Sequence, residues 1–289
     1  MILSLLNTTA LLVFKRTSFT MPRGRTLLNV VSELEKFAPL NLAEKWDNVG
    51  LLIEPPKERS IRKILLTNDL TERVMKEAVE QATDLIVSYH PPIFAPLKRI
   101  TQKNWKERIV SICLAEGIAL YSPHTAWDAV PGGVNDWLSS ALPCIDMQPI
   151  QPNPLGAEFG GAGRTFTTSL TLGQAVARVQ RHIGLNVHLA LGVNHDLDTP
   201  ITVVAVCAGS GGSLLKGYEA DLFITGEMSH HEVLDANHQN TSVILCNHSN
   251  SERGFLHKFQ NKLDDMLKGD CEIIISEKDE DPLKTQVKS

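Results

Sequence analysis

Residues 61–90 read IRKILLTNDLTERVMKEAVEQATDLIVSYH, in which two short apolar runs flank an amphipathic stretch. The runs at 61–66 and 84–89 have the length and composition of buried strands, and the stretch at 71–82 has helical spacing. A strand, a helix and a second strand joined by short loops form a parallel βαβ unit. We therefore predict a parallel sheet that is covered by helices on both faces.

The same alternation continues along the chain. A helix at 105–116 and a strand at 118–121 follow, and a junction rich in proline and glycine then precedes a second set of elements. This set is a helix at 171–183, strands at 187–191, 201–207, 222–225 and 243–246, and a helix at 252–267. The pattern predicts an α/β fold of two βα lobes, with mostly parallel sheets covered by helices and a cleft between the lobes. The expected parts are a targeting segment or disordered tail (1–25), a first lobe (26–148), a second lobe (149–279) and a charged tail (280–289).

Composition and charge narrow the class of protein. The 289 residues carry a formal net charge of −5, and 43% of them are hydrophobic, as in an ordinary globular protein. No apolar run reaches the roughly 20 residues that span a bilayer, and no basic region follows residue 30. We therefore expect neither a membrane nor nucleic acid as a direct partner. The five cysteines are an odd number without a CxxC pair, which favours a reducing compartment and a cytoplasmic protein.

Residues 1–32 differ in composition from the rest of the chain. They contain no acidic residue, four basic residues, and an apolar stretch from Met1 to Phe14. This composition resembles a mitochondrial presequence more than a secretory signal, in which positive charge precedes the apolar segment. A disordered tail and an upstream start that precedes Met21 are the alternatives. A mitochondrial pool is expected if the segment targets the protein.

Histidine and carboxylate side chains recur where predicted strands end. His90, His124, Glu227 and His248 each follow a predicted strand within three residues. The ends of parallel strands gather at one edge of a sheet, and α/β proteins collect functional residues there. Imidazole and carboxylate together suit Zn, Mn, Fe or Ni, and a carboxylate can bridge two ions. We expect one or two divalent metal ions per subunit in the cleft between the lobes.

Two of these histidines have a carboxylate four residues later. His124 precedes Asp128, and His248 precedes Glu252. On a helix this spacing places both side chains on one face, where they can chelate one ion. The structural alternatives are an Asp128 side chain that caps a helix at 131–136 and a surface pair at His248 and Glu252.

The segment around Glu227 is open to two interpretations. Glu227 can act as a general acid or base if its environment tunes its pKa. Ser229 can cap a short helix, which leaves Glu227 unexplained. His230 and His231 are adjacent and cannot both point towards one centre. The glycine-rich loop at 209–212 matches neither phosphate-binding motif, so a tight turn is the better interpretation.

Several segments between residues 46 and 254 match one family in content and order. They are Trp46-Asp-Asn-Val-Gly-Leu, Ser88-Tyr-His-Pro-Pro-Ile-Phe, His124-Thr-Ala-Trp-Asp with Pro131-Gly-Gly-Val-Asn-Asp, Gly226-Glu-Met-Ser-His-His, and Asn247-His-Ser-Asn-Ser-Glu-Arg-Gly. Together they resemble the Nif-three-like family, also named the GTP cyclohydrolase I type 2-like family. The resemblance implies a two-lobed α/β protein that assembles into a hexameric toroid, with a dinuclear metal site facing the interior.

The resemblance also assigns roles to residues. It implies that the metal ligands are His90, Asp128, His248 and Glu252, with Asp128 as the bridging carboxylate. His124 matches a histidine close to the metals and Glu227 lies in the family's Gly-Glu motif, so we expect these two as catalytic residues.

The chain departs from the family at one position. Many bacterial relatives have two adjacent histidines where this chain has Tyr89 and His90. A neutral phenol is a poor substitute for an imidazole ligand. The second ion is therefore expected to bind weakly or not at all.

Two hypotheses about function follow. The first is a metal-dependent hydrolase of a small or nucleotide-like substrate, because a metal-bound hydroxide is available at neutral pH. The residues do not themselves select GTP, since no guanine-reading aspartate motif or phosphate loop is present. The second is a non-enzymatic protein-interaction factor in transcriptional co-regulation, because eukaryotic relatives are described as partners of co-regulators. It would place part of the protein in the nucleus.

Overall fold

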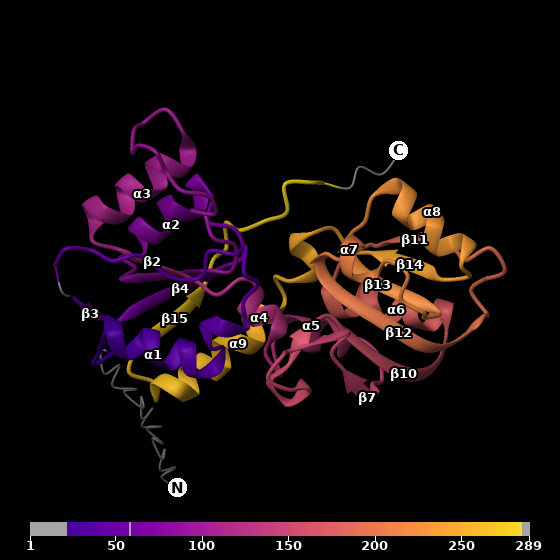
Figure 1. Cartoon of the computed structure of the whole chain (residues 1–289). Coiled ribbons are helices and arrows are strands. Elements are labelled where there is room, and N and C mark those ends of the chain that lie inside the picture. The colour runs from indigo at the N-terminus through magenta and orange to yellow at the C-terminus, as the bar shows by residue number, and fades with distance from the viewer. Residues whose placement is uncertain (1–21, 58, 285–289) are drawn as a thin grey trace, which may run out of the picture.

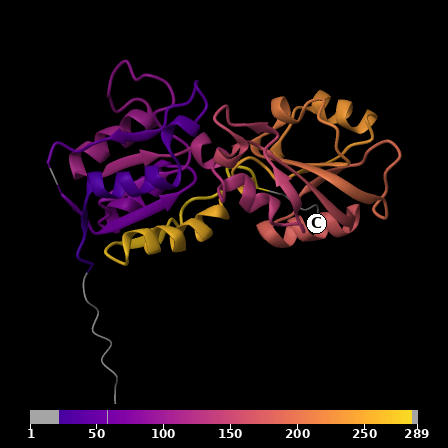
Figure 2. The ribbon, with the colours of Figure 1, turned by 60° about the horizontal axis from the view of Figure 1, so that its bottom comes forward.

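The computed structural model describes residues 22–57 and 59–284, which form two α/β lobes (Figures 1 and 2). The sheet of the first lobe has the order β15-β4-β5-β6-β2, in which β2 is antiparallel to β6 and the other pairs are parallel. The strands are β2 (Gly50–Ile53), β4 (Lys63–Thr67), β5 (Leu85–Ser88), β6 (Ala119–Ser122) and β15 (Glu272–Ile275). The parallel unit predicted from residues 61–90 is confirmed.

Helices cover both faces of the first sheet. Ile64 and Leu66 pack with α1 and α9, while Leu65 between them packs with α2 and α3 on the other face. Burial on both faces explains why the strands of this sheet are continuous apolar runs. The four helices are α1 (Leu27–Phe37), α2 (Glu72–Glu80), α3 (Trp105–Glu116) and α9 (Phe255–Leu267).

The sheet of the second lobe is mixed. Its order is β11-β14-β13-β12-β10-β7; the three central strands are parallel and the outer pairs are antiparallel. The strands β7 and β10 were not expected. In β10, threonines and a serine separate the apolar residues, so the segment contains no apolar run. The strands are β7 (Ile145–Gln148), β10 (Arg164–Thr171), β11 (His188–Ala190), β12 (Pro200–Ser210), β13 (Leu222–Glu227) and β14 (Ser242–Leu245).

The helices of the second lobe also lie on both faces of its sheet. The apolar side of α6, predicted from Leu172, Ala175 and Val179, is buried, and Thr171 caps this helix. The helices are α5 (Val134–Ser139) and α6 (Leu172–Ile183) on one face, and α7 (Gly212–Leu215) and α8 (His230–His238) on the other. The remaining short elements are α4 (Thr125–Ala129), η1 (Leu40–Leu42), η2 (Ala157–Phe159), η3 (Ser249–Ser251) and the strand pairs β1 (Arg25–Thr26) with β3 (Ser60–Ile61) and β8 (Gln151–Pro152) with β9 (Gly161–Ala162).

The chain returns to the first lobe after it has built the second. Helix α9 packs beside α1, and β15 pairs with β4 in parallel register (Figure 2). The lobe boundaries at 148/149 and 279/280 stay predictions, but this return was not expected. Two lobes joined by two crossings of the chain are more firmly connected than two lobes joined by a single linker.

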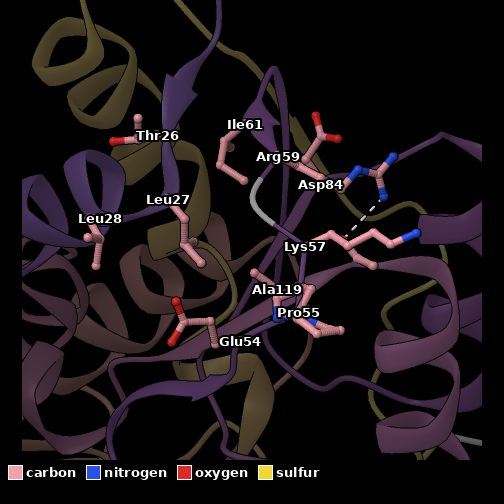
Figure 3. Close-up of a pocket in the computed structure, with 12 residues that line it drawn as sticks. Thr26, Leu27, Leu28, Glu54, Pro55, Lys57, Arg59, Ile61, Asp84 and Ala119 are labelled. Carbon is pink, nitrogen blue, oxygen red and sulfur yellow. Dashed lines mark hydrogen bonds between the residues drawn. The ribbon is translucent and has the colours of Figure 1, made fainter.

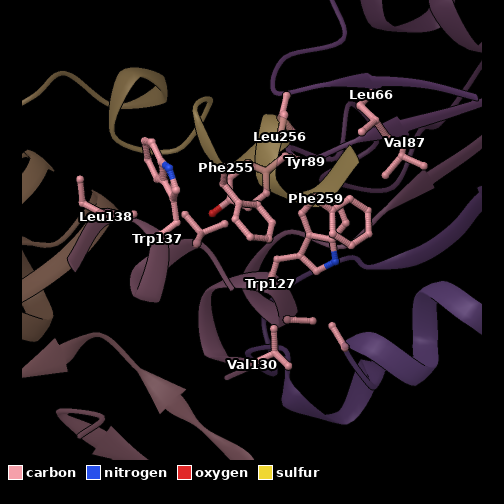
Figure 4. Close-up of a cluster of buried hydrophobic side chains, with 14 of the residues drawn as sticks. Leu66, Val87, Tyr89, Trp127, Val130, Trp137, Leu138, Phe255, Leu256 and Phe259 are labelled. Carbon is pink, nitrogen blue, oxygen red and sulfur yellow. The ribbon is translucent and has the colours of Figure 1, made fainter. Parts of the chain in front are cut away.

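One apolar cluster runs from the first sheet through α4, α5 and α9 to the second sheet (Figure 4). Trp127 is fully buried at its middle, with its ring centroid 4.1 Å from that of Phe259. Replacing a buried Trp by Ala typically costs about 3–5 kcal/mol. Because the core is continuous between the lobes, groups that face each other across their junction are held in a fixed relation.

Two further expectations concern the N-terminal segment and the crossing of a membrane. Residues 1–21 of the expected targeting segment or tail lie outside the described residues. Within residues 22–57 and 59–284, none of the helices has both the length and the apolar composition that crossing a membrane requires.

Candidate metal centre

The side chains singled out at strand ends come together between the lobes. His90 follows β5 and His124 follows β6, both in the first sheet. Glu227 ends β13 and His248 follows β14, both in the second sheet. The carboxyl ends of both sets of parallel strands are therefore turned towards one site, the arrangement expected of open α/β sheets.

His90, His248 and Glu252 form a cluster that can hold a metal ion. One potential ligand atom from each lies within 4.8 Å of the others. Glu252 lies between the two imidazoles, with 3.4 Å from its Oε2 to Nε2 of His90 and 3.5 Å from its Oε1 to Nε2 of His248. Its side chain is only 3% exposed. A carboxylate placed between two imidazoles from different lobes is a donor set suited to a transition metal.

A carboxylate holds the far nitrogen of each histidine. Nδ1 of His90 is 2.9 Å from Oδ1 of Asp69, and Nδ1 of His248 is 2.8 Å from Oε1 of Glu227. A carboxylate at Nδ1 keeps the proton on that atom and leaves Nε2 available as a ligand. Asp69 was not predicted as a site residue, although it follows a strand just as His90 does. Glu227, expected as a catalytic residue, contacts His248 in this structure.

The surroundings of the cluster fit one ion. Nε2 of His90 is buried and has no hydrogen-bond partner among the described residues. Asn68 donates from Nδ2 to Oε2 of Glu252 at 3.1 Å, which orients that carboxylate. At Gly209, with φ +66°, a Cβ atom would lie 2.5 Å from Oε1 of Glu252 and 3.2 Å from Nε2 of His248. The glycine-rich loop, interpreted as a tight turn, thus also leaves space for the cluster.

The charges of the cluster are strongly coupled. Although burial opposes it, the carboxylates of Glu252 and Asp69 raise the pKa of His90 to about 10. Burial likewise opposes ionisation of Glu252, but His90 and His248 hold its pKa below the usual value. A proton on His90 balances the buried negative charge. A divalent cation at the same atoms would supply that balance and release the proton.

Asp128 lies beside the cluster, held by Tyr89. The Tyr89 hydroxyl donates to Oδ1 of Asp128 at 2.5 Å. Burial and the nearby Glu252 raise the pKa of Asp128 to about 6, and burial and Asp128 raise the pKa of Tyr89 well above its usual value. Tyr89 is therefore a neutral donor. Asp128 as a bridging ligand stays a prediction. The alternative of an Asp128 cap is wrong, because the N-cap of α5 is Gly133, which has no side-chain cap hydrogen bond. Asp136, inside α5, accepts from the backbone N–H of Gly132.

His124 precedes helix α4 and has an unusual backbone conformation, with φ 36°. Its Nδ1 is 2.7 Å from Oδ1 of the buried Asp47, a partner that was not predicted. Its ring lies 5.4 Å from the ring of His90. Because His124 is the N-cap of α4, it does not share a regular helical face with Asp128. It lies next to the cluster without belonging to it.

His230 and His231 begin α8 and are exposed. Ser229 caps this helix, with Glu232 completing a capping box. Neither histidine belongs to the cluster formed by the described residues.

Two exposed aromatic side chains lie at the rim of the site. The ring of Trp46 is 6.0 Å from those of Phe94 and His124. Trp46 is 60% exposed and Phe94 is 47% exposed. The loops that carry them are joined by a hydrogen bond from Nδ2 of Asn48 to the carbonyl of Ile93. The rim therefore offers an apolar surface in a defined position.

A cavity of about 340 Å³ lies elsewhere, at the amino ends of β5 and β6 (Figure 3). Arg59, at its wall, donates to the carbonyls of Glu116 and Gly117. The carboxylate of Asp84 accepts from the backbone N–H groups of Arg62 and Lys63. These polar groups serve the local backbone, so the candidate chemistry lies at the opposite ends of these strands.

Comparison with known proteins identifies the family. Residues 26–282 match the sequence profile described as Duf34/NIF3 (NGG1p interacting factor 3). The chain belongs to the Duf34/NIF3 family. NIF3-like protein 1 of Drosophila melanogaster is 61% identical over 91% of this chain and 90% of the relative. NGG1-interacting factor 3 of Saccharomyces cerevisiae is 37% identical over 88% of this chain and 95% of the relative.

A solved structure has a similar fold over most of the chain. A Bacillus cereus protein related to NIF3 superposes with a TM-score of 0.80 at 20% identity, covering 91% of this chain and 99% of the other. At that identity the similarity concerns the fold alone. The family resemblance and the two-lobed α/β fold class are thus confirmed for this member of the Duf34/NIF3 family.

Proposed function

We propose that this Duf34/NIF3 protein is a metal-dependent hydrolase with one firmly bound divalent ion per subunit. The observation that carries the proposal is Nε2 of His90, which is buried without a hydrogen-bond partner among the described residues and points into a cluster with His248 and Glu252. Leaving a buried polar atom unpaired is costly, and coordination of an ion removes that cost.

His90, His248 and Glu252 would hold the ion, with Asp128 as an additional carboxylate. A bound divalent ion supplies a nucleophilic hydroxide at neutral pH and polarises the substrate. Tyr89 donates to Oδ1 of Asp128, so Oδ2 is the oxygen that Asp128 would offer to an ion. Because Tyr89 is a neutral phenol and not an imidazole ligand, a second ion would bind weakly.

His124 is the first candidate for moving a proton. Asp47 holds its Nδ1, so Nε2 is the atom that can accept or donate a proton near the cluster. Glu227 is the second candidate, although its carboxylate contacts His248.

The substrate would be small, with a planar ring such as that of a nucleotide. The exposed rings of Trp46 and Phe94 beside His124 support this class, because aromatic faces stack on planar rings. A substrate stacked on this surface would have the bond to be hydrolysed next to the metal centre.

The test combines elemental analysis with a hydrolysis screen of the purified full chain. Wild type should carry about one divalent ion per chain, and His90→Gln should carry almost none. The screen covers phosphate esters and nucleotides, with Trp46→Ala as the comparison, which should raise KM without changing metal content. If the wild type binds no metal, or binds it and hydrolyses none of these compounds, the hydrolase proposal fails.

Asp128→Ala separates the hydrolase hypothesis from the protein-interaction hypothesis. Loss of metal with retained fold and retained partner binding favours a non-enzymatic role.

A protein-interaction factor in transcriptional co-regulation is the second candidate function. It is favoured by one observation, the name of the yeast relative, NGG1-interacting factor 3. Binding of partner proteins that survives metal removal and the His90→Gln change would support it. If partner binding is instead lost with the metal, binding of partner proteins depends on the same metal site as the proposed hydrolysis.

The proposal also includes a homo-hexameric assembly and a cytoplasmic location with a mitochondrial pool. A homo-hexamer should give a solution mass near six times 31.9 kDa by light scattering. Deletion of residues 1–20 should abolish a mitochondrial pool of the otherwise cytoplasmic protein and leave metal binding intact. An unchanged distribution would show that this segment is not a targeting signal.

A further inference from the structure

Residues 276–284, here called the C-terminal strap, follow β15 and leave the first sheet (Figure 1). The strap begins attached to the first lobe. The backbone N–H of Ser276 donates to the carbonyl of Leu66 at 2.9 Å, and that of Glu277 donates to Oε1 of Glu77 at 2.9 Å. Part of this segment was expected as a charged tail, but its acidic side chains make specific contacts.

Asp279 is the central contact of the strap. Its side chain is only 2% exposed. Its Oδ2 accepts a hydrogen bond of 2.6 Å from the backbone N–H of Asn68 and lies 3.4 Å from Nε of Arg253. A buried carboxylate that contacts both a backbone N–H and a guanidinium has a fixed orientation, because each partner restricts it.

Asp281, two residues after Asp279, makes a second set of contacts. Its Oδ2 accepts from the Ser249 hydroxyl at 3.3 Å, and its Oδ1 accepts from the backbone N–H of Leu283 at 2.7 Å. Ser249 also accepts from Nη2 of Arg253 at 2.9 Å. The strap therefore contacts Ser249, the first residue of η3, and Arg253, which follows Glu252 after that turn.

Three residues outside the strap that Asp279 and Asp281 contact adjoin the candidate metal centre. Ser249 follows His248, and Arg253 follows Glu252. The third contact is the backbone of Asn68, whose side chain orients Glu252. The strap thus connects the loop after β4 in the first lobe to the turn after β14 in the second.

We propose that the C-terminal strap positions the metal centre, with Asp279 as a positioning residue that fixes Asn68 and Arg253 behind Glu252. This inference rests on the proposed metal site. It adds a requirement that the cluster alone does not suggest: three ligands from two lobes reach coordination distance only while a separate segment holds their loops together. Partners behind metal ligands commonly contribute about 10- to 100-fold in affinity.

The experiment compares four full-length proteins: wild type, Asp279→Asn, Asp279→Ala and the control Glu280→Gln. Glu280 is the neighbouring acid of the strap, pairs with Arg73 and Lys284 on the surface, and contacts no residue of the site among those described. Zn²⁺ affinity is measured by competition with a chelator, the absorption spectrum is recorded with Co²⁺, and thermal unfolding is followed in EDTA.

Both Asp279 variants should bind Zn²⁺ about 10- to 100-fold more weakly and should show an altered Co²⁺ spectrum, while Glu280→Gln should match the wild type. A purely structural strap would lower the unfolding temperature in EDTA and leave the affinity and spectrum of the folded protein unchanged, which would overturn the proposal. Asp279→Asn keeps the shape of the side chain, so it remains informative if Asp279→Ala does not fold. Failure of the wild type to bind Zn²⁺ or Co²⁺ would reject the metal site itself, an outcome distinct from normal binding by the variants.

Discussion

The first and second lobes contribute to the candidate metal centre by the same construction but with different burial. In each lobe a histidine follows a parallel strand and a carboxylate holds its Nδ1 atom. In the first lobe the His90 side chain is 20% exposed and its partner Asp69 is 34% exposed. In the second lobe His248 is 38% exposed and its partner Glu227 is 56% exposed.

This difference in exposure distinguishes the contributions of the two lobes to the candidate site. The first lobe provides an enclosed histidine whose Nε2 lacks a hydrogen bond to any described residue, and the proposed ion would be positioned there. The second lobe provides a more exposed histidine. Glu252 belongs to neither half alone, because it contacts both rings.

The largest expected effect comes from Glu252→Gln, which removes the charge shared by both halves. Metal affinity should fall by more than the roughly 10- to 100-fold typical of partners behind the ligands. Elemental analysis after dialysis should find almost no ion, while gel filtration and circular dichroism should match the wild type. An ion content equal to that of wild type would show that the charge of Glu252 does not hold the ion.

Gly209→Ala should disturb the centre from the second lobe. A Cβ atom at Gly209 would approach Glu252, and the positive φ adds strain of roughly 1–3 kcal/mol. Gly217→Ala is the matched control, because Gly217 has φ +74° but a Cβ atom added there would meet no described atom within 4 Å. Both variants should unfold at a lower temperature, and only Gly209→Ala should lose metal affinity. Equal affinities in the two variants would mean that Gly209 matters for backbone conformation alone.

Asp69→Asn and Glu227→Gln compare the two halves directly. Both remove the charge at a histidine Nδ1. Asp69→Asn should weaken metal binding by about 10- to 100-fold, and Glu227→Gln should weaken it less, because solvent screens the exposed pair. Chelator competition measures both changes. The reverse order would contradict the idea that the enclosed half defines the ion position.

The smallest effect is expected in the pH dependence of the metal-free protein. Burial alone would lower the pKa of His90, but Glu252 and Asp69 raise it from 6.5 to about 10 in the folded state. The stabilisation from charged His90 is therefore complete below about pH 6.5 and is lost as the pH rises towards 10. Denaturant unfolding in EDTA should show stability falling over that interval, and His90→Gln should show a shallower fall. Parallel curves would indicate that His90 does not carry this charge.

Local sequence was sufficient to predict most of the strands, the main helices and the placement of histidines at strand ends. His90 lies at the carboxyl edge of the first sheet, and His248 and Glu252 follow a strand of the second sheet. Placing each of them at a carboxyl edge follows a rule that needs no knowledge of the pairing order. The same rule, applied to the strand at 61–66, points to Asp69. The helix predicted from 252 begins at Phe255 instead, because η3 turns the chain between His248 and Glu252.

Other features had no local signal. The hydrogen bond from Tyr89 to Asp128, the contact of His124 with Asp47 and the pairing of β15 with β4 join residues far apart in the chain. The strap contact from Asn68 to Asp279 spans 211 positions. Charged residues at the end of a domain are usually solvated, so composition alone predicted a tail there.

The return of the chain to the first sheet also determines when the protein can be completed during synthesis. A nascent chain that has emerged only as far as β14 has both histidines, but the edge of β4 is still unpaired because β15 has not been made. An unpaired strand edge is open to pairing with other chains. Neither that edge nor the strap contact at Asn68 can close until residues 272–281 leave the ribosome. Translation order thus delays the joining of the two halves until nearly all of the described chain is available.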